Sequence, residues 1–137
     1  MKAELAAAGE DEALEALSTL EADPRTFVVD IAPKGLRWLR AKWHGSAFTD
    51  VTADAGDRLG GALSVTAGRR NFGKDVRMMH ELGHVYFDLT ESFRSYGTLS
   101  AWRAASGAFA VQMENAMRRA SGCQPRANHG VRGPFCP

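Results

Sequence analysis

Residues 80–84, His-Glu-Leu-Gly-His, have the types and spacing of a metal-dependent hydrolytic site. On an α-helix, positions i and i+4 lie on one face, so both imidazoles can reach one divalent ion at about 2.0–2.1 Å. Glu81 lies beside that face, where its carboxylate can accept a proton from a water molecule activated by zinc and pass it to a leaving amine. The motif predicts one Zn²⁺ with His80 and His84 as ligands, and Glu81 as the general base and acid.

A catalytic zinc site needs a third protein ligand. The metzincin pattern would require Gly at 87 and His at 90, but the chain has Phe87 and Thr90, so that class is excluded. Glu114 is the preferred third ligand, because it falls in the middle of the next predicted helix, and an antiparallel helix can return its carboxylate to the first. The alternatives are Glu91, His129 and Asp88.

Further polar residues are candidates for supporting the ligands. Asp88 follows His84 by four residues, so it could hold an imidazole N–H; pairing with Arg94 is an alternative for it. Asn115 and Arg118 flank Glu114, and Arg118 could orient that carboxylate, fix the tail, or form an ordinary surface salt bridge. The oxyanion of the transition state needs a donor besides the metal, and the candidates are Tyr96, His129 and Arg126.

The elements that must position these residues follow from hydrophobic periodicity and from turn residues. We expect an amphipathic helix over 3–21, a strand over 26–31, and an ambiguous segment over 36–43. Strands over 47–52 and 62–67 should form a hairpin or lie side by side. A helix should run from Asn71 or Gly73 to about Leu89, and another from Ser100 to about Ala120. This order predicts a small α+β domain with a short sheet, an HExxH helix and a following ligand-bearing helix.

The composition is that of one ordinary globular domain. The chain has 137 residues, of which 45% are hydrophobic and 24% charged, with a net charge of +1. No apolar run is long enough for a membrane span, and the first residues lack the apolar core of a secretory signal. Charge is uneven, with acids concentrated in residues 1–30 and none after Glu114. Basic and aromatic residues do not interleave, which argues against nucleic-acid binding.

The only two cysteines, Cys123 and Cys136, lie close together near the C-terminus. In an oxidising compartment they could form a disulfide that closes a short loop, and in a reducing one they could remain two thiols. Residues 1–24 form either an N-terminal helix or a junction with an upstream segment, and residues 25–137 form the catalytic domain.

The segment 62–67 precedes the motif helix directly. In zinc peptidases of this architecture a substrate usually lies extended along an exposed edge strand in that place, so this segment could bind a protein or peptide by strand addition. The alternative is an internal strand.

The residues from His80 to His84, together with Glu114, resemble the gluzincin class of zinc metallopeptidases, a zincin-like fold. More narrowly, residues 110–118, followed by Gly122, Arg126 and the pair 129–130, look like the NleD-like metallopeptidase domains of bacterial effectors and polymorphic toxins. This resemblance implies zinc-dependent peptide-bond hydrolysis and delivery by a specialised secretion system. It also implies an upstream delivery domain and a cognate immunity protein as partners. Unlike thermolysin, the chain has Arg118 rather than Asp four residues after Glu114.

Two further functions remain open at this point. One is a non-catalytic, zinc-stabilised binding module, against which the presence of Glu81 speaks. The other is a metal-dependent amidase that acts on a non-protein amide such as a cell-wall crosslink, for which the zinc chemistry would be the same.

Overall fold

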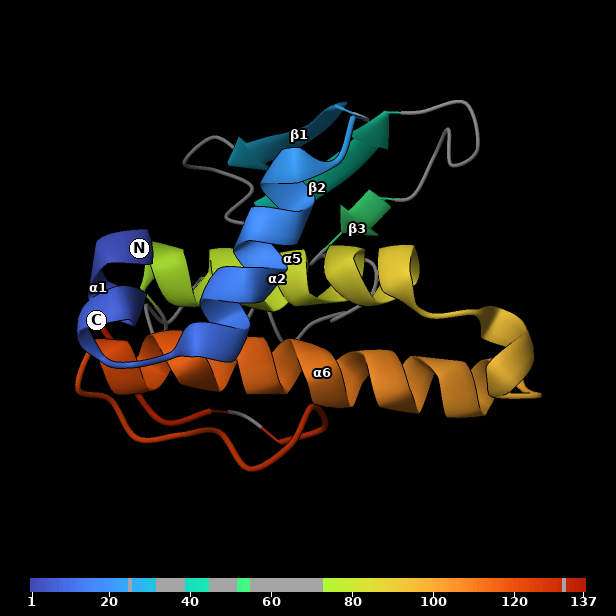
Figure 1. The fold of residues 1–137 in the computed structure, drawn as a ribbon. Helices are drawn as coiled ribbons and strands as arrows, with labels where there is room; N and C mark the ends of the chain where they lie inside the picture. The colour runs from blue at the N-terminus through green and yellow to red at the C-terminus, as the bar shows by residue number, and fades with distance from the viewer. Residues whose placement is uncertain (25, 32–38, 45–51, 55–72, 132) are drawn as a thin grey trace.

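The fold is shown in Figure 1, from a computed structural model that describes residues 1–24, 26–31, 39–44, 52–54, 73–131 and 133–137. For residues 26–31, 39–44, 52–54 and 74 the description covers the backbone alone. In chain order the elements are α1 (Lys2–Ala7), α2 (Asp11–Ala22), β1 (Thr26–Ile31), β2 (Leu39–His44), β3 (Thr52–Asp54), α5 (Lys74–Thr90), the 3-10 helix η1 (Phe93–Ser95) and α6 (Leu99–Ala120).

Helices α5 and α6 lie antiparallel and side by side, joined by the short segment that contains η1 (Figure 1). Their backbones approach closely at Gly83, where an added Cβ would lie 2.8 Å from the Cα of Ala110. Only a residue without a side chain leaves room for that approach. The motif helix is therefore held directly against α6.

Helix α6 has clear signals at both of its ends. The side chain of Thr98 accepts a hydrogen bond from the backbone N–H of Ala101 at 3.1 Å, which satisfies one of the donors that the first turn leaves open. Ser100, where the sequence predicted the start of this helix, is already inside it. At the other end Gly122 adopts a left-handed φ of 69°, a conformation that glycine enters without steric cost.

The N-terminal helices pack onto the same core as α5 and α6. Leu5 of α1, and Leu17 and Leu20 of α2, are buried in one cluster with methionines and valines of the two long helices. The single helix expected over 3–21 is wrong: the chain forms two helices, separated at Gly9 with its φ of 71°. Residues 1–24 are thus an integral part of this core.

The backbone of residues 26–54 contains a three-stranded antiparallel sheet in the order β1-β2-β3. Thr26 pairs with His44 and Ile31 with Leu39 across the first pair, while Lys42 pairs with Thr52 across the second. The strand expected over 26–31 is confirmed. In Figure 1 the sheet lies on the side of α5 that faces away from α6.

The expected α+β fold class is contradicted. Among the residues whose side chains the structure describes, 68% are helical and none lies in a strand or sheet. The physical reason is that the core is formed by apolar faces of α1, α2, α5 and α6, which bury one another. The candidate site consequently rests on a helical scaffold.

The segment 62–67, expected to be a strand along which a substrate could bind, lies outside the described residues, as does most of the expected strand 47–52. Within the described part of the chain, no helix is both long and apolar enough to cross a membrane.

Candidate metal centre

Helix α5 presents the two histidines of the motif on one buried face. His80 and His84 are 2% and 4% exposed, and their ring centroids lie 5.0 Å apart. One turn of helix separates them, as the i, i+4 spacing requires. Local helix geometry alone therefore brings these two imidazoles together.

A third imidazole comes from the C-terminal tail. The ring of His129 stacks on His80 with a centroid distance of 5.3 Å and lies edge-on to His84 at 5.5 Å. Among the described residues, the ligand atoms of His80, His84 and His129 lie within 4.8 Å of one another. Three histidines are a known ligand set of catalytic zinc, and they leave one coordination position for water or substrate.

Hydrogen bonds to Nδ1 orient the two helical imidazoles. The Nδ1 of His80 lies 2.8 Å from Oε2 of Glu114, and the Nδ1 of His84 lies 2.7 Å from Oγ of Ser106. Because an ionised carboxylate can only accept, His80 carries its proton on Nδ1 and keeps the lone pair on Nε2. Support of this kind, with a polar group on the ring nitrogen opposite the metal, is typical of metal-binding histidines.

The Nε2 atoms give a direct test of whether a cation fits here. Within the described residues, the Nε2 atoms of His80 and His129 are buried and make no hydrogen bond. A buried nitrogen lone pair without a partner is costly, and a bound cation satisfies several of them at once. The residues present therefore fit a divalent metal ion that prefers nitrogen ligands, such as Zn²⁺.

The protonation states agree with this fit. Burial lowers the pKa of His80, although the Glu114 carboxylate opposes the shift, and burial with nearby positive charge lowers the pKa of His129 to about 4. Both imidazoles are therefore neutral at pH 7, which is the state that binds a metal ion.

Glu114 is the centre of a buried charge cluster that we call the hub, consisting of Glu114, Arg118 and Arg126. The Oε1 of Glu114 accepts a hydrogen bond from Nε of Arg118 at 2.7 Å, and its Oε2 accepts one from Nη1 of Arg126 at 3.0 Å. Burial by itself would raise the pKa of Glu114, but the His80 hydrogen bond and the two arginines outweigh it and lower the pKa to about 2. A paired, fully ionised carboxylate results.

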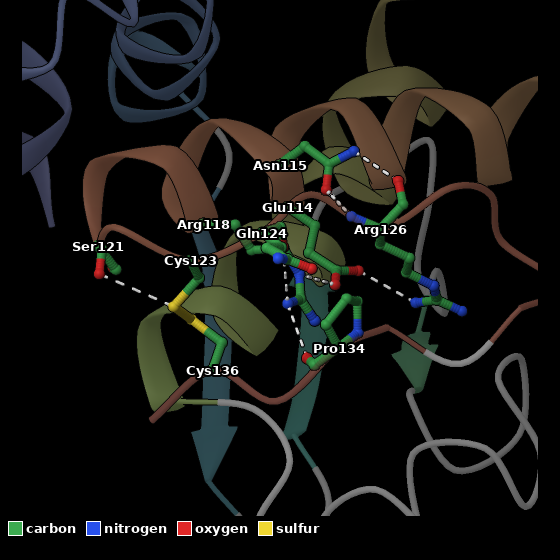
Figure 2. Close-up of a disulfide and its surroundings, with 9 residues drawn as sticks. All are labelled: Glu114, Asn115, Arg118, Ser121, Cys123, Gln124, Arg126, Pro134 and Cys136. Carbon is green, nitrogen blue, oxygen red and sulfur yellow. Dashed lines mark hydrogen bonds and ion pairs between the residues drawn. A yellow bond between two sulfur atoms is a disulfide. The ribbon is translucent and has the colours of Figure 1, made fainter.

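Arg126 connects the hub to the tail. Its Nη2 donates to the carbonyl oxygen of His129 at 2.5 Å, and its Nε donates to that of Val131 at 2.7 Å. Asn115 of α6 holds the backbone of Arg126 from the other side, through bonds of 2.8 and 2.7 Å to its carbonyl oxygen and N–H (Figure 2). These contacts fix the tail segment that carries the third imidazole.

The remainder of the tail is closed by a disulfide. Cys123 and Cys136 are bonded, and Cys136 is completely buried. Beneath this loop, Nη1 of Arg118 donates to the carbonyl oxygen of Pro134 at 2.9 Å and reaches that of Gln124 at 3.3 Å (Figure 2). The bond between the cysteines, which the sequence left open, thus encloses the segment from Arg126 to His129.

Two small residues of α6 that the sequence analysis missed shape the centre. Ser106 holds His84, as described above. At Gly107 an added Cβ would lie 2.9 Å from Cγ of His129, so the absence of a side chain here leaves room for the third imidazole. A glycine inside a helix costs about 1 kcal/mol relative to alanine, and that cost was the available signal.

The structure separates the other candidates. Glu114 is outside the three-histidine group and supports His80 through Nδ1, whereas His129, an alternative in the sequence analysis, joins the group. Glu81 is buried at 1% exposure. Ser106 bonds the Nδ1 of His84, the role considered for Asp88.

Of the three candidate oxyanion donors, His129 lines a cleft beside the imidazoles, whereas Tyr96 and Arg126 do not. The Tyr96 hydroxyl donates to Oε2 of Glu91 at 3.2 Å, and its ring packs against Phe87 and Trp102. The guanidinium of Arg126 is occupied by the Glu114 carboxylate and by carbonyl oxygens of the tail. Tyr96 and Arg126 are therefore not placed to donate to an oxyanion. His129 belongs to the group of three histidines.

A cleft opens beside the imidazoles. It has a volume of about 610 Å³, and its lining includes His84, His129 and the first turns of α6 at Leu99, Trp102, Arg103 and Ser106. A molecule in this cleft would contact His84 and His129.

Comparisons of the chain with protein-family models, curated proteins and solved structures find no match.

Proposed function

We propose that this chain is a zinc-dependent hydrolase that cleaves peptide bonds, with His80, His84 and His129 holding the ion. The observation that carries the proposal is the convergence of two buried imidazoles and the half-buried imidazole of His129, beside a cleft that His84 and His129 line. Glu81 follows His80 directly on the same helix. Three protein ligands leave a coordination position open, which a purely structural site closes with a fourth.

Bound zinc would supply Lewis acidity, which polarises a carbonyl group and favours ionisation of water. The chain itself supplies three other things. Glu81, buried beside the ligands, accepts the proton of the attacking water and returns it to the leaving nitrogen. Glu114 and Ser106 fix the two helical imidazoles, and the walls of the cleft hold the substrate.

The proposal keeps the resemblance to NleD-like metallopeptidase domains but changes the ligand set. The gluzincin pattern would use Glu114 as a ligand, whereas the geometry favours His129 in that position, with Glu114 supporting His80 through its Nδ1. The disulfide is consistent with action outside a reducing cytosol, and delivery by a secretion system is part of the proposal.

The decisive experiment compares the zinc-loaded full chain with its Glu81→Gln variant. We expect wild type to cleave members of a mixed fluorogenic peptide library, and Glu81→Gln to lose about 10²–10⁴-fold in rate. Zinc affinity, measured by competition with a chromophoric chelator, should stay within a few-fold.

Three outcomes would contradict the proposal. Undiminished cleavage by Glu81→Gln removes the mechanism. Zinc binding without hydrolysis of any peptide or amide would indicate a binding module. Hydrolysis of cell-wall fragments, but not of peptides, would indicate an amidase.

A further inference from the structure

The cleft beside the imidazoles is built from one stripe of α6. Leu99, Trp102, Arg103 and Ser106 follow one another at i, i+3, i+4 and i+7, so they share one face of the helix. Further along α6 the same face is buried against α5 and the hub. Only in its first two turns does the stripe open onto solvent, and there it becomes the wall of the cleft.

The cleft has a one-sided charge. Arg103 is exposed, and among the described residues of the lining it is the only one with a fixed formal charge. Among the ion pairs of the described residues, none includes Arg103. A cation in a partly enclosed cleft attracts anions and disfavours cations, especially where few other charges compensate it.

An apolar surface adjoins this cation. The side chain of Leu99 is 51% exposed, and that of Phe93, whose ring lies 5.8 Å from Trp102, is 48% exposed. Exposed apolar side chains beside a concave site are typical of a surface that receives a ligand. The cleft therefore offers a cationic contact and an apolar contact close together.

We infer that the cleft selects peptides that carry an acidic side chain next to an apolar one, and that Arg103 is the residue that determines this preference. The inference rests on the proposed function, because it names the substrate class of the same site. Ser106 and Arg103 are three residues apart, about 4.5 Å along the helix axis. An extended chain rises about 3.3 Å per residue, so the carboxylate should lie within about three residues of the scissile bond.

The test uses octapeptides that differ at a single position, which is Glu, Gln or Lys in turn and is moved along the sequence. Binding is measured by fluorescence anisotropy on zinc-loaded Glu81→Gln protein, so that turnover is not needed for the readout. In the Glu81→Gln background we expect Glu peptides to bind at least tenfold more tightly than Lys peptides at low salt, with the difference shrinking as salt is added.

Substitutions of Arg103 then test whether this residue determines the charge preference. Arg103→Gln should abolish the preference, and Arg103→Glu should invert it, with zinc affinity unchanged in both. Arg94→Gln, which removes an exposed arginine outside the cleft lining, is the matched control and should keep the preference. In the active protein the effect should appear in KM rather than in kcat.

Equal binding of the three peptides, no binding of any, or a preference that survives Arg103→Glu would overturn the inference. Hydrolysis by wild type without a charge preference would leave the proposed function standing and refute only the role of Arg103. Acidic peptides that bind through Arg103 but are never cleaved would refute the proposed function and leave the inference standing.

Discussion

The group of three histidines joins two regions of different character, the α5–α6 helix pair and the C-terminal tail. His80 and His84 are neighbours because a helix repeats, and the helix pair keeps its shape through a close-packed backbone contact at Gly83. His129 belongs to no helix or strand and reaches the same point only because the hub, Asn115 and a disulfide hold the tail. Two of the imidazoles are therefore fixed by local helix geometry and the third by long-range contacts. The two regions should therefore fail in different ways.

The largest effect should come from Glu114→Gln, which leaves Arg118 and Arg126 buried without their counter-charge. Removing one partner of a buried ion pair costs about 3–5 kcal/mol, so we expect a loss of that size in the free energy of unfolding of the metal-free protein. Urea denaturation measures it. The control is Glu91→Gln, an exposed glutamate outside the hub, which should change stability by less than about 0.5 kcal/mol. Similar unfolding free energies for the two variants would contradict the stabilising role of Glu114 in the hub.

Removing the disulfide should have the next largest effect, concentrated in the tail. The cysteines are 13 residues apart, and closing a loop of that size stabilises by about 3 kcal/mol. Treatment with a dithiol reductant should lower both the unfolding free energy and the zinc affinity. The variant with Cys123→Ser and Cys136→Ser should match the reduced protein and be insensitive to the reductant. If reduction left zinc affinity unchanged, the tail would not be held in the way described.

The next prediction contrasts the two regions with one kind of substitution. Gly107→Ala should push the His129 ring away and weaken zinc binding about 10–100-fold, the range seen when groups that support ligands are removed. It should not lower the stability of the metal-free protein, because alanine favours the helix. Gly83→Ala should instead act mainly on stability. Its added Cβ meets the backbone of Ala110, so the unfolding free energy should fall by about 1–3 kcal/mol. If the two variants changed zinc affinity and unfolding free energy alike, the two regions would not be fixed in different ways.

The last prediction concerns the pH dependence of stability. The pKa of His129 is about 4 in the folded chain, against 6.5 for an ordinary histidine, so between these values only the unfolded chain binds the proton. Stability of the metal-free protein should therefore fall as pH drops from 6.5 to 4. Glu114, with its pKa lowered to about 2 from 4.5, adds a loss of the same sign between 4.5 and 2. His129→Gln should flatten the upper part of the profile, and a slope that survives this change would count against the assignment.

The same comparison explains what the sequence could predict. His80, Glu81 and His84 could be predicted because their arrangement depends on a single helix, and the strand over 26–31 because it is a short local pattern. The sequence could not determine the role of Glu114, because its position on the next helix is compatible both with binding a metal and with supporting His80. His129 was only an alternative, since no local rule determines where a tail without secondary structure returns.

The fold class failed for a related reason. Strand patterns in the middle of the chain predicted an α+β domain with a short sheet, but the described core is made by helices. Two of these are the N-terminal helices, whose sequence is typical of a single helix. Ser106 shows no signal by type alone, and the helix-interior Gly107 gives only the signal of its helix cost, because the roles of both depend on the partners that the fold places opposite them.

The most direct measurement is anomalous diffraction at the zinc edge from crystals of the zinc-loaded full chain. The account predicts one peak per chain at about 2.0–2.1 Å from the Nε2 atoms of His80, His84 and His129, with the Glu114 carboxylate on the Nδ1 of His80. A peak bonded to Glu114 while His129 lies elsewhere, or no peak at this point, would contradict it.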